Sequence, residues 1–469
     1  MGLNSILEIG KSGLNIFSVA QEVTGENIAN VNTPGYSRQR VVLESAPPVQ
    51  ANGFPLGTGV KISTVERYYD GLLQNQLINA QTTQGFDTTK STVLHQIEPS
   101  FNEVSNDGLG AAITKFFSSW QDLTLNPAGT AERQAVLSST QVLTDNFKAV
   151  STTLTNAISG QNDALPPLTD GINATLKNIA ALNGQIKTTE LVSGNANEIR
   201  DQRDQLIRDL SQQIGITTTE NSDGSTDVNF ADTGAALVSG ATAGAFSLDK
   251  TTNPASFAVM LTPAGVVGTP PVAVTPVTGQ LGATLYLRDN TTGGIPSYLN
   301  KLNSLASTIV SEVNTQHKLG YDLSGTTTGA NFFTSTGTTA ATISLDAGIT
   351  GTDKIAASGV INTLGDNSNA LALAQLQGKK TMSLGTATFG SSYNALVSSV
   401  GQDVQSANNS QAQDVAFTKQ LTTLRESNSG VSLDEELTNL VKYQRSYQAS
   451  AKLITTATDM MDVVIGLIR

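Results

Sequence analysis

Residues 432–468 read SLDEELTNLVKYQRSYQASAKLITTATDMMDVVIGLI, which is the most regular pattern in the chain. Ser432 followed by Glu435 predicts a capping box at the start of a helix, and neither Gly nor Pro interrupts the pattern before Gly466. At about 1.5 Å per residue, such a helix would be about 50 Å long. Its apolar residues recur at alternating spacings of four and three, as in a coiled-coil seam: Leu433, Leu437, Leu440, Tyr447, Ala451, Ile454, Met461, Ile465 and Ile468.

The amino-terminal segment has a related pattern. Its apolar residues also follow a 3.5-residue repeat: Leu3, Leu7, Leu14, Phe17, Ile28 and Val31. We therefore expect residues 1–40 and 430–469 to form an inner coiled-coil pair, with the alternative that the last helix is a core helix of its own domain. Gly10, Gly13 and Gly25 each cost about 1 kcal/mol relative to Ala in a helix, so we expect both ends to be mobile in the monomer and to order on assembly.

Between these ends the chain alternates between helical and irregular stretches. Helical spacing dominates from about Asp70 to Ile214 and resumes at Tyr298, whereas residues 32–59 are rich in turn residues and 320–365 in Gly and Thr. We therefore predict an α+β multidomain fold with nested parts: a long-helix coiled-coil inner domain from both termini (1–40 and 430–469), a mainly helical middle domain (41–215 and 295–429), and an inserted small β domain (216–294).

Composition excludes several classes of function. Lys and Arg total 27 against 39 Asp and Glu, so the net charge is −12 and no basic face for nucleic acid is expected. The chain has no Cys, which removes disulfides, thiolate nucleophiles and Cys-based metal sites. Its two His, His95 and His317, are interpreted as ordinary histidines of a helix surface or loop. No apolar run is long enough for membrane insertion, and the first residues lack the pattern of a cleaved signal peptide, so an exported chain would keep its own terminus.

The candidate catalytic and ligand motifs fail on spacing. Gly10-Lys11-Ser12 resembles the end of a phosphate-binding loop, but the first Gly of that loop would have to stand at Ser5. Residues 221–224 resemble part of a calcium loop that lacks its final Glu, and a hairpin turn at Asp223-Gly224 explains them better. The acidic residues 434–436 are interpreted as part of a helix cap. We therefore expect no enzyme activity, no cofactor and no metal site.

Short motifs at both ends resemble one family. The run IANVNTPGY at 28–36 closely resembles the signature of the bacterial flagellar rod, hook and hook-associated axial proteins. Its continuation SRQRV at 37–41 is similar to the hook-filament junction branch of that family. At the other end, SLDEEL at 432–437 and YQRSYQASAK at 443–452 are similar to the family's terminal helix.

The resemblance implies a structural role. It implies subunits that stack helically around a channel and connect the flagellar hook to the filament in bacterial motility. The implied partners are copies of the chain itself, the flagellar hook protein, the second hook-filament junction protein, and a cytoplasmic export chaperone on the C-terminal region. It also implies type III export and an extracellular location in the flagellum, with no nucleic acid and no membrane insertion.

The signature is predicted to be a sharp exit from the first helix, made by Asn30, Asn32, Thr33, Pro34, Gly35 and Tyr36. Residues 33–36 fit a type II turn, because Pro sets φ at the second position and Gly accepts the positive φ of the third. The Asn side chains can satisfy backbone groups where the helix stops. The turn would direct the chain from the coiled coil into the next domain.

Two other classes of function stay open. One is a secreted adhesin or binding module displayed by its β domain, and deletion of that domain would distinguish it. The other is a secreted hydrolase in the same domain. Residues 217–294 contain no His and no Glu other than Glu220, which leaves little for acid-base catalysis.

Overall fold

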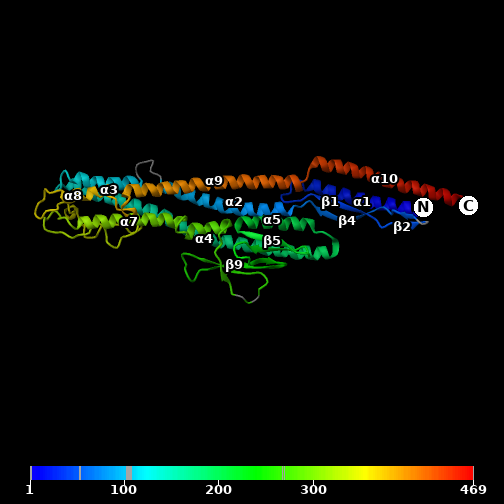
Figure 1. Cartoon of the computed structure of the whole chain (residues 1–469), viewed down its shortest axis with the longest axis horizontal. Helices are drawn as coiled ribbons and strands as arrows, with labels where there is room; N and C mark the ends of the chain where they lie inside the picture. Colours follow the sequence, from blue (N-terminus) through cyan, green and yellow to red (C-terminus); the bar gives the residue numbers. More distant parts are fainter. Residues whose placement is uncertain (1–2, 52–53, 102–107, 267, 269, 468–469) are drawn as a thin grey trace.

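The computed structural model describes residues 3–51, 54–101, 108–266, 268 and 270–467. The molecule is elongated, and both termini lie at one end (Figure 1). At that end α1 (Leu3–Ala29) and α10 (Leu433–Gly466) pack side by side in antiparallel orientation. The helices predicted at the two ends of the chain are therefore present.

A β hairpin follows α1. β1 (Gln39–Ser45) pairs antiparallel with β4 (Val60–Arg67), and β2 (Val49–Ala51) pairs with β3 (Phe54–Leu56) beyond them. Sequence analysis identifies residues 32–59 only as rich in turn residues and does not predict this hairpin. Most of the hairpin's described side chains are exposed or half-buried, so its strands have no buried row of alternating apolar residues that sequence analysis could detect.

A bundle of helices forms the middle of the molecule. In chain order its members are α2 (Gly71–Ile97), α3 (Leu109–Leu123), α4 (Thr130–Ser193), α5 (Asn197–Gln213), α6 (Gly279–Asp289), α7 (Ile295–His317), α8 (Ser368–Gln375) and α9 (Phe389–Ser429). α4 is 64 residues long and turns into α5 through Gly194, which has a φ of 84°. α9 lies beside α2 and leads into α10 (Figure 1).

The larger apolar core lies at the end of the molecule away from the termini. It is built around the fully buried aromatic side chains Phe116, Phe117, Trp120, Phe332 and Phe333. The chain between α7 and α8 covers this core with turns, isolated bridges and a three-residue 3-10 helix at 352–354, and another such helix stands at 383–385, between α8 and α9. The Gly- and Thr-rich sequence predicts such loops, but tertiary contacts decide the conformation that the loops adopt. The side chain of Asn314, for example, bonds the backbone of Phe332 and Phe333.

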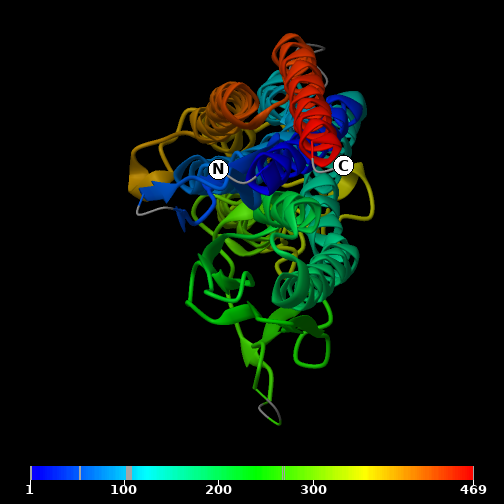
Figure 2. The same ribbon diagram turned by 90° about the vertical axis from the view of Figure 1, so that its right-hand side faces the viewer.

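The β domain protrudes from one side of the bundle (Figure 2). It consists of two antiparallel sheets, with strand orders β5-β6-β7-β8 and β11-β10-β9. The strands are β5 (Ile216–Glu220), β6 (Thr226–Phe230), β7 (Ala236–Ser239), β8 (Thr242–Ala243), β9 (Ala245–Asp249), β10 (Ala258–Thr262) and β11 (Val272–Ala273).

The last part of the predicted β region is helical. Residues 279–289 form α6, and its Leu281 and Leu285 are buried in the core that the β strands share with α2 and α4. The two ends of the inserted segment meet just before α6 begins. A Cβ on Gly215 would lie only 2.1 Å from Thr278 Oγ1. The predicted β domain of residues 216–294 therefore includes a helix that sequence analysis does not predict. Packing against α2 and α4 decides the structure of this short segment.

Candidate assembly surface and the junction that supports it

Two glycines of α1 allow α10 to approach closely. A Cβ on Gly10 would lie 2.6 Å from Ile454 Cγ1, and a Cβ on Gly13 would lie 2.6 Å from Ser450 Oγ. Gly25 is different, because a Cβ there would have no described atom within 4 Å. Sequence analysis treats all three glycines as a cost to helix stability, whereas Gly10 and Gly13 also permit the contact between the helices.

The row of α10 that faces α1 recurs every seven residues and comprises Glu436, Tyr443, Ser450 and Ala457. Glu436 and Ala457 are buried, and Tyr443 stacks on Phe17 of α1 with 6.4 Å between ring centroids. Sequence analysis missed most of this row because Glu, Ser and Ala do not stand out in a pattern of apolar residues. It also missed Ile16 and Ala20, the buried apolar residues of α1.

The structure divides the predicted seam into two sets. The half-buried positions are Leu7, Leu14, Phe17, Ile28, Val31, Leu440, Ala451, Ile454 and Met461. Exposed positions are Leu433, Leu437, Tyr447 and Ile465. The side chain of Leu3 and the whole of Ile468 lie outside the described part of the chain.

We use the name free face for the exposed apolar residues at this end of the chain that lie outside the row facing α1: Leu433, Leu437, Val441, Tyr447, Leu453, Met460, Val463 and Ile465 of α10, and Leu467 at its C-cap. Their exposure ranges from 39% at Leu453 to 80% at Leu467. Lys442, Arg445 and Lys452 stand among them, and residues 437–458 contain no acidic residue although the whole chain is acidic. An extended apolar surface of this kind is typical of an interaction site.

The signature turn has two features of a type II turn. Gly35 has a φ of 84°, and Tyr36 N–H donates to Thr33 O at 3.2 Å. Thr33 Oγ1 donates to Asn30 Oδ1, and Asn30 Nδ2 donates to a carbonyl in the last turn of α1. Asn30 thus bonds both the turn and the last turn of the helix. The remaining signature residues, Asn32 and Pro34, are exposed.

Tyr36 joins the turn to the start of the hairpin. Its buried hydroxyl donates to Asn27 Oδ1 at 2.9 Å, and Asn27 exchanges two further hydrogen bonds of 2.9 Å with the backbone of Gln39. Burial raises the pKa of Tyr36, so its hydroxyl stays protonated as a donor. Asn27 and Gln39 were not singled out from the sequence, since a lone Asn within a helix carries no local signal of such a bridge.

Asp201 of α5 binds the signature segment to the helical bundle. The backbone N–H and hydroxyl of Ser37 donate to its two carboxylate oxygens at 2.7 and 2.8 Å. Arg67 of β4 binds Asp201 at 2.7 Å and Asp204 at 2.8 Å, and all three side chains are buried. Burial lowers the pKa of Arg67, but the two aspartates outweigh it and raise the pKa above its ordinary value. Removal of one partner from such a buried pair costs about 3–5 kcal/mol.

Arg38 binds the start of α10. Its guanidinium contacts Glu435 at 2.6 Å and Glu436 at 2.7 Å, and its backbone N–H donates to Ser429 O. The predicted capping box is wrong. Ser432 occupies the N-cap position without a side-chain cap bond, and the Glu435 carboxylate binds Arg38 instead of the end of the helix.

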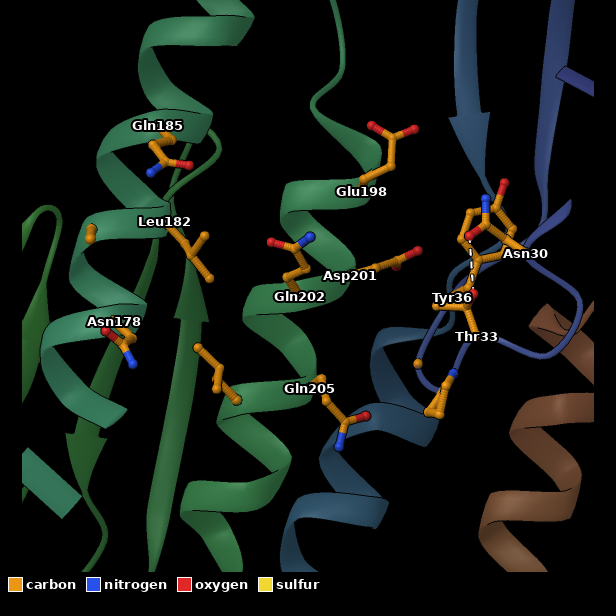
Figure 3. A pocket seen from close by; sticks show the side chains of 14 residues that line it. Asn30, Thr33, Tyr36, Asn178, Leu182, Gln185, Glu198, Asp201, Gln202 and Gln205 are labelled. Atoms are coloured by element: carbon orange, nitrogen blue, oxygen red, sulfur yellow. Dashed lines mark hydrogen bonds between the residues drawn. The ribbon is translucent and has the colours of Figure 1, made fainter. Parts of the chain in front are cut away.

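A groove with a volume of about 610 Å³ opens beside the signature turn. Figure 3 shows Asn30, Thr33 and Tyr36 of the turn on one side, with Asn178, Leu182 and Gln185 of α4 and Glu198, Asp201, Gln202 and Gln205 of α5 on the other. The lining is mainly apolar surface and side-chain amides. Amides both donate and accept hydrogen bonds, so these side chains can bond the backbone of a polypeptide.

The interpretation of His317 as a surface or loop histidine is wrong. It is fully buried at the end of α7, where Nδ1 lies 2.9 Å from Ala330 O and Nε2 accepts from Ala356 N–H at 3.0 Å. Burial lowers its pKa to about 4, which keeps the ring neutral and able to accept this bond. His95 is exposed on α2, as the sequence predicts.

Clusters of metal-binding side chains and membrane-spanning helices are both absent from the described residues. Within them no group of three or more His, Asp or Glu side chains could hold a metal ion. Likewise, none of the helices described is long and apolar enough to cross a membrane.

Comparison with protein families agrees with the motifs at both ends. Residues 94–333 match the family of the flagellar hook-associated protein FlgK helical domain. Residues 7–36 match the flagella basal body rod protein family, and residues 425–467 match the C-terminal family of the flagellar basal body rod FlgEFG proteins.

Similar proteins extend over nearly the whole chain. Flagellar hook-associated protein 1 of Escherichia coli (strain K12) is 28% identical over 99% of this chain and 100% of its own length. Flagellar hook-associated protein 1 of Bacillus subtilis (strain 168) is 30% identical over 98% of this chain and 97% of its own length. The solved structure of the flagellar hook junction protein FlgK from Burkholderia pseudomallei has the same fold, with a TM-score of 0.68, 18% identity, and coverage of 76% of this chain and 100% of that chain.

The terminal helices, the signature turn and these matches define an axial protein of the bacterial flagellum. The chain belongs to the flagellar hook-associated protein 1 (FlgK) family.

Proposed function

We propose that this protein is a structural subunit that joins the flagellar hook to the filament and self-assembles through its terminal helices. The free face of α10 is the main structural support, because it leaves apolar side chains along the helix exposed among the described residues. The name of the relatives, flagellar hook-associated protein 1, supports the position at the hook.

We further propose the nested layout predicted from the sequence, with the terminal pair innermost and the β domain outermost. Copies of the chain would surround a channel, with the hook protein and the second junction protein as axial neighbours. Export would use the flagellar type III apparatus, with a cytoplasmic chaperone on the C-terminal region. The proposed role requires no enzyme activity, and the relatives reported above are named for the hook rather than for an adhesin.

Complementation of a deletion strain tests the proposal. The deletion strain should make hooks without filaments in electron micrographs, and the wild-type gene should restore filaments. A Leu433→Glu/Leu437→Glu variant should be secreted yet fail to restore them, because both side chains belong to the free face. Leu384→Glu is the matched control, since Leu384 is also exposed but lies in a turn far from α10.

Secretion is measured separately by immunoblotting of the culture medium. This measurement distinguishes failure of assembly from failure of export or loss of chaperone binding. Full restoration of filaments by the double variant would contradict an assembly role for the free face. Normal filaments in the deletion strain itself would contradict the junction role.

A further inference from the structure

The helical bundle has two separate apolar cores, and α4 passes from one to the other. Residues 136–154 of α4 contribute buried side chains to the large core. Residues 165–180 contribute to the core that the bundle shares with the β strands, which we call the shared core. Pro166 and Pro167 lie inside this helix and directly follow Leu165. The two prolines therefore stand where α4 enters the shared core.

The backbone of α4 is weakened at this position. Proline has no N–H, so the helical bonds from Pro166 and Pro167 to the carbonyls four residues earlier, at Asn162 and Asp163, cannot form. Thr169 Oγ1 lies 2.9 and 3.0 Å from two carbonyl oxygens of the preceding turn, and a hydroxyl bonded in this way often bends a helix. Sharp bends in helices occur mainly at positions of this kind. We therefore expect α4 to bend most easily here.

Helix α6 marks the boundary between the two cores. Its Leu285 belongs to the shared core and its Leu287 to the large core. Arg288, the next residue, donates from Nη1 to Asn162 Oδ1 of α4 at 2.9 Å and to Phe257 O of the β domain at 2.9 Å. The boundary between the cores and the weakened part of α4 thus lie side by side.

Helices α2 and α9 cross the same level with ring contacts and hydrogen bonds. The ring of Phe86 in α2 lies 5.8 Å from the ring of Tyr286 in α6. Further along α2, Ser91 Oγ donates to Asn408 Oδ1 of α9 at 2.7 Å. Contacts of this kind adjust to a small change of angle more easily than the close-packed side chains of a core.

We propose that the bundle bends at this boundary, with Pro166 and Pro167 of α4 as its hinge. The half that contains the large core lies away from the termini (Figure 1) and tilts as one body. The other half contains the shared core and α5, whose Asp201 holds the signature segment. The far half can therefore change its tilt while the signature turn stays attached. The inference goes beyond the junction role and does not depend on it.

Distances between pairs of spin labels, measured by double electron–electron resonance on the full-length protein, test the hinge. The chain has no Cys, so labels attach only at Cys residues that are introduced. Ser247→Cys in β9 and Ser311→Cys in α7 place exposed labels in the two halves. In the control pair, Gln202→Cys in α5 replaces Ser311→Cys, so that both labels lie in the half with the shared core.

The expected effect is a broad distribution of distances across the hinge. The segment of α7 from Ile295 to Ser311 is about 24 Å long, so a change of about 20° at the hinge moves Ser311 sideways by about 8 Å. The distribution for the Ser247–Ser311 label pair should therefore be about twice as wide as that for the control pair.

Two proline variants make the test specific. Pro166→Ala/Pro167→Ala restores the two missing backbone bonds, so it should narrow the distribution across the hinge to the width of the control pair. Pro296→Ala is the matched control, because Pro296 stands in the first turn of α7, where a missing N–H removes no helical bond. This variant should leave the distribution as wide as in the wild type.

Equal widths for the two label pairs in the wild type would overturn the hinge. A distribution that stays wide in Pro166→Ala/Pro167→Ala would also overturn it, because the bending would then not depend on the prolines. Circular dichroism confirms that each variant is folded. If the double variant does not fold, Pro167→Ala alone provides the test, because Pro167 is exposed and its replacement restores one of the two bonds.

Discussion

The contact between α1 and α10 depends on the absence of a side chain at Gly13. Gly13→Leu would push against Ser450, and overpacking of this kind costs about 1–3 kcal/mol. Gly25→Leu is the matched control, because its Cβ meets no described atom and Leu favours a helix over Gly by about 0.5–1 kcal/mol. We expect only Gly13→Leu to speed proteolysis of α1. Equal rates in both variants would show that the close approach is unimportant.

Two substitutions in the signature turn distinguish the need for a positive φ at Gly35 from the need for the hydroxyl group of Tyr36. Gly35→Val places a β-branched residue at positive φ and brings its Cβ to 3.0 Å from Gln205 Oε1. Tyr36→Phe removes one buried hydroxyl, which costs about 1 kcal/mol, while Asn27 Oδ1 keeps its bond from Gln39.

We therefore expect Gly35→Val to impair junction assembly more than Tyr36→Phe, with secretion unchanged in both. Counts of filaments per cell and immunoblots of the medium measure the two effects. Equal incorporation of Gly35→Val and wild type would show that the positive φ at Gly35 is not required.

At the scale of helices, the terminal pair is held by one narrow contact. α10 meets α1 through the row of Glu436, Tyr443, Ser450 and Ala457 and through Ile454, and its free face is exposed among the described residues. We expect this pair to open in the monomer and to become ordered when copies assemble, since their packing would cover the free face. We do not expect α7 to open in the monomer, because its apolar side is buried in the large core.

Limited trypsin digestion of the monomer should reveal this difference. Cleavage is expected first at Lys442, Arg445 and Lys452 of α10, which are exposed on an opening helix. Lys301 of α7 is an equally exposed control on a firmly packed helix, and it should be cut much later. Cleavage of α10 as slow as cleavage at Lys301 would contradict the mobility of the ends.

At the scale of the whole molecule, the β domain is an insertion whose core is shared with the helices. Its ends meet at Gly215 and Thr278, but its strands bury Ile172, Leu176 and Ile179 of α4. Replacement of residues 217–277 by a short Gly/Ser linker would expose these side chains. Exposure of each side chain would remove at most about 1.5–3 kcal/mol of hydrophobic stabilisation, so the free energy of unfolding of the middle domain should be lower.

Replacement of residues 220–292 by the same linker should be clearly worse. This deletion also removes α6, whose Leu281, Leu285 and Leu287 are buried in the two cores of the bundle. Thermal unfolding followed by circular dichroism ranks the two variants. Equal melting temperatures would show that α6 belongs to the dispensable insertion rather than to the bundle.

Elements with a long local repeat could be predicted from the sequence. The terminal helices have periodic apolar residues over many turns, and the turn at Gly35 needs the φ that only Gly adopts easily. The hairpin at residues 39–67 and α6 could not be predicted in the same way. Both are short, and contacts with residues far away in the sequence decide their structure.

The sequence by itself determined that both ends of this chain are helices, that a turn follows the first, and which family the motifs resemble. Only the tertiary structure decided which side of α10 meets α1 and which is left free. A periodic apolar pattern shows that a helix has an interacting side, but Gly10, Gly13 and Ser450 set the rotation through close approach. The same holds for Asp201 and His317, whose roles arise from partners that folding brings to them from distant parts of the chain.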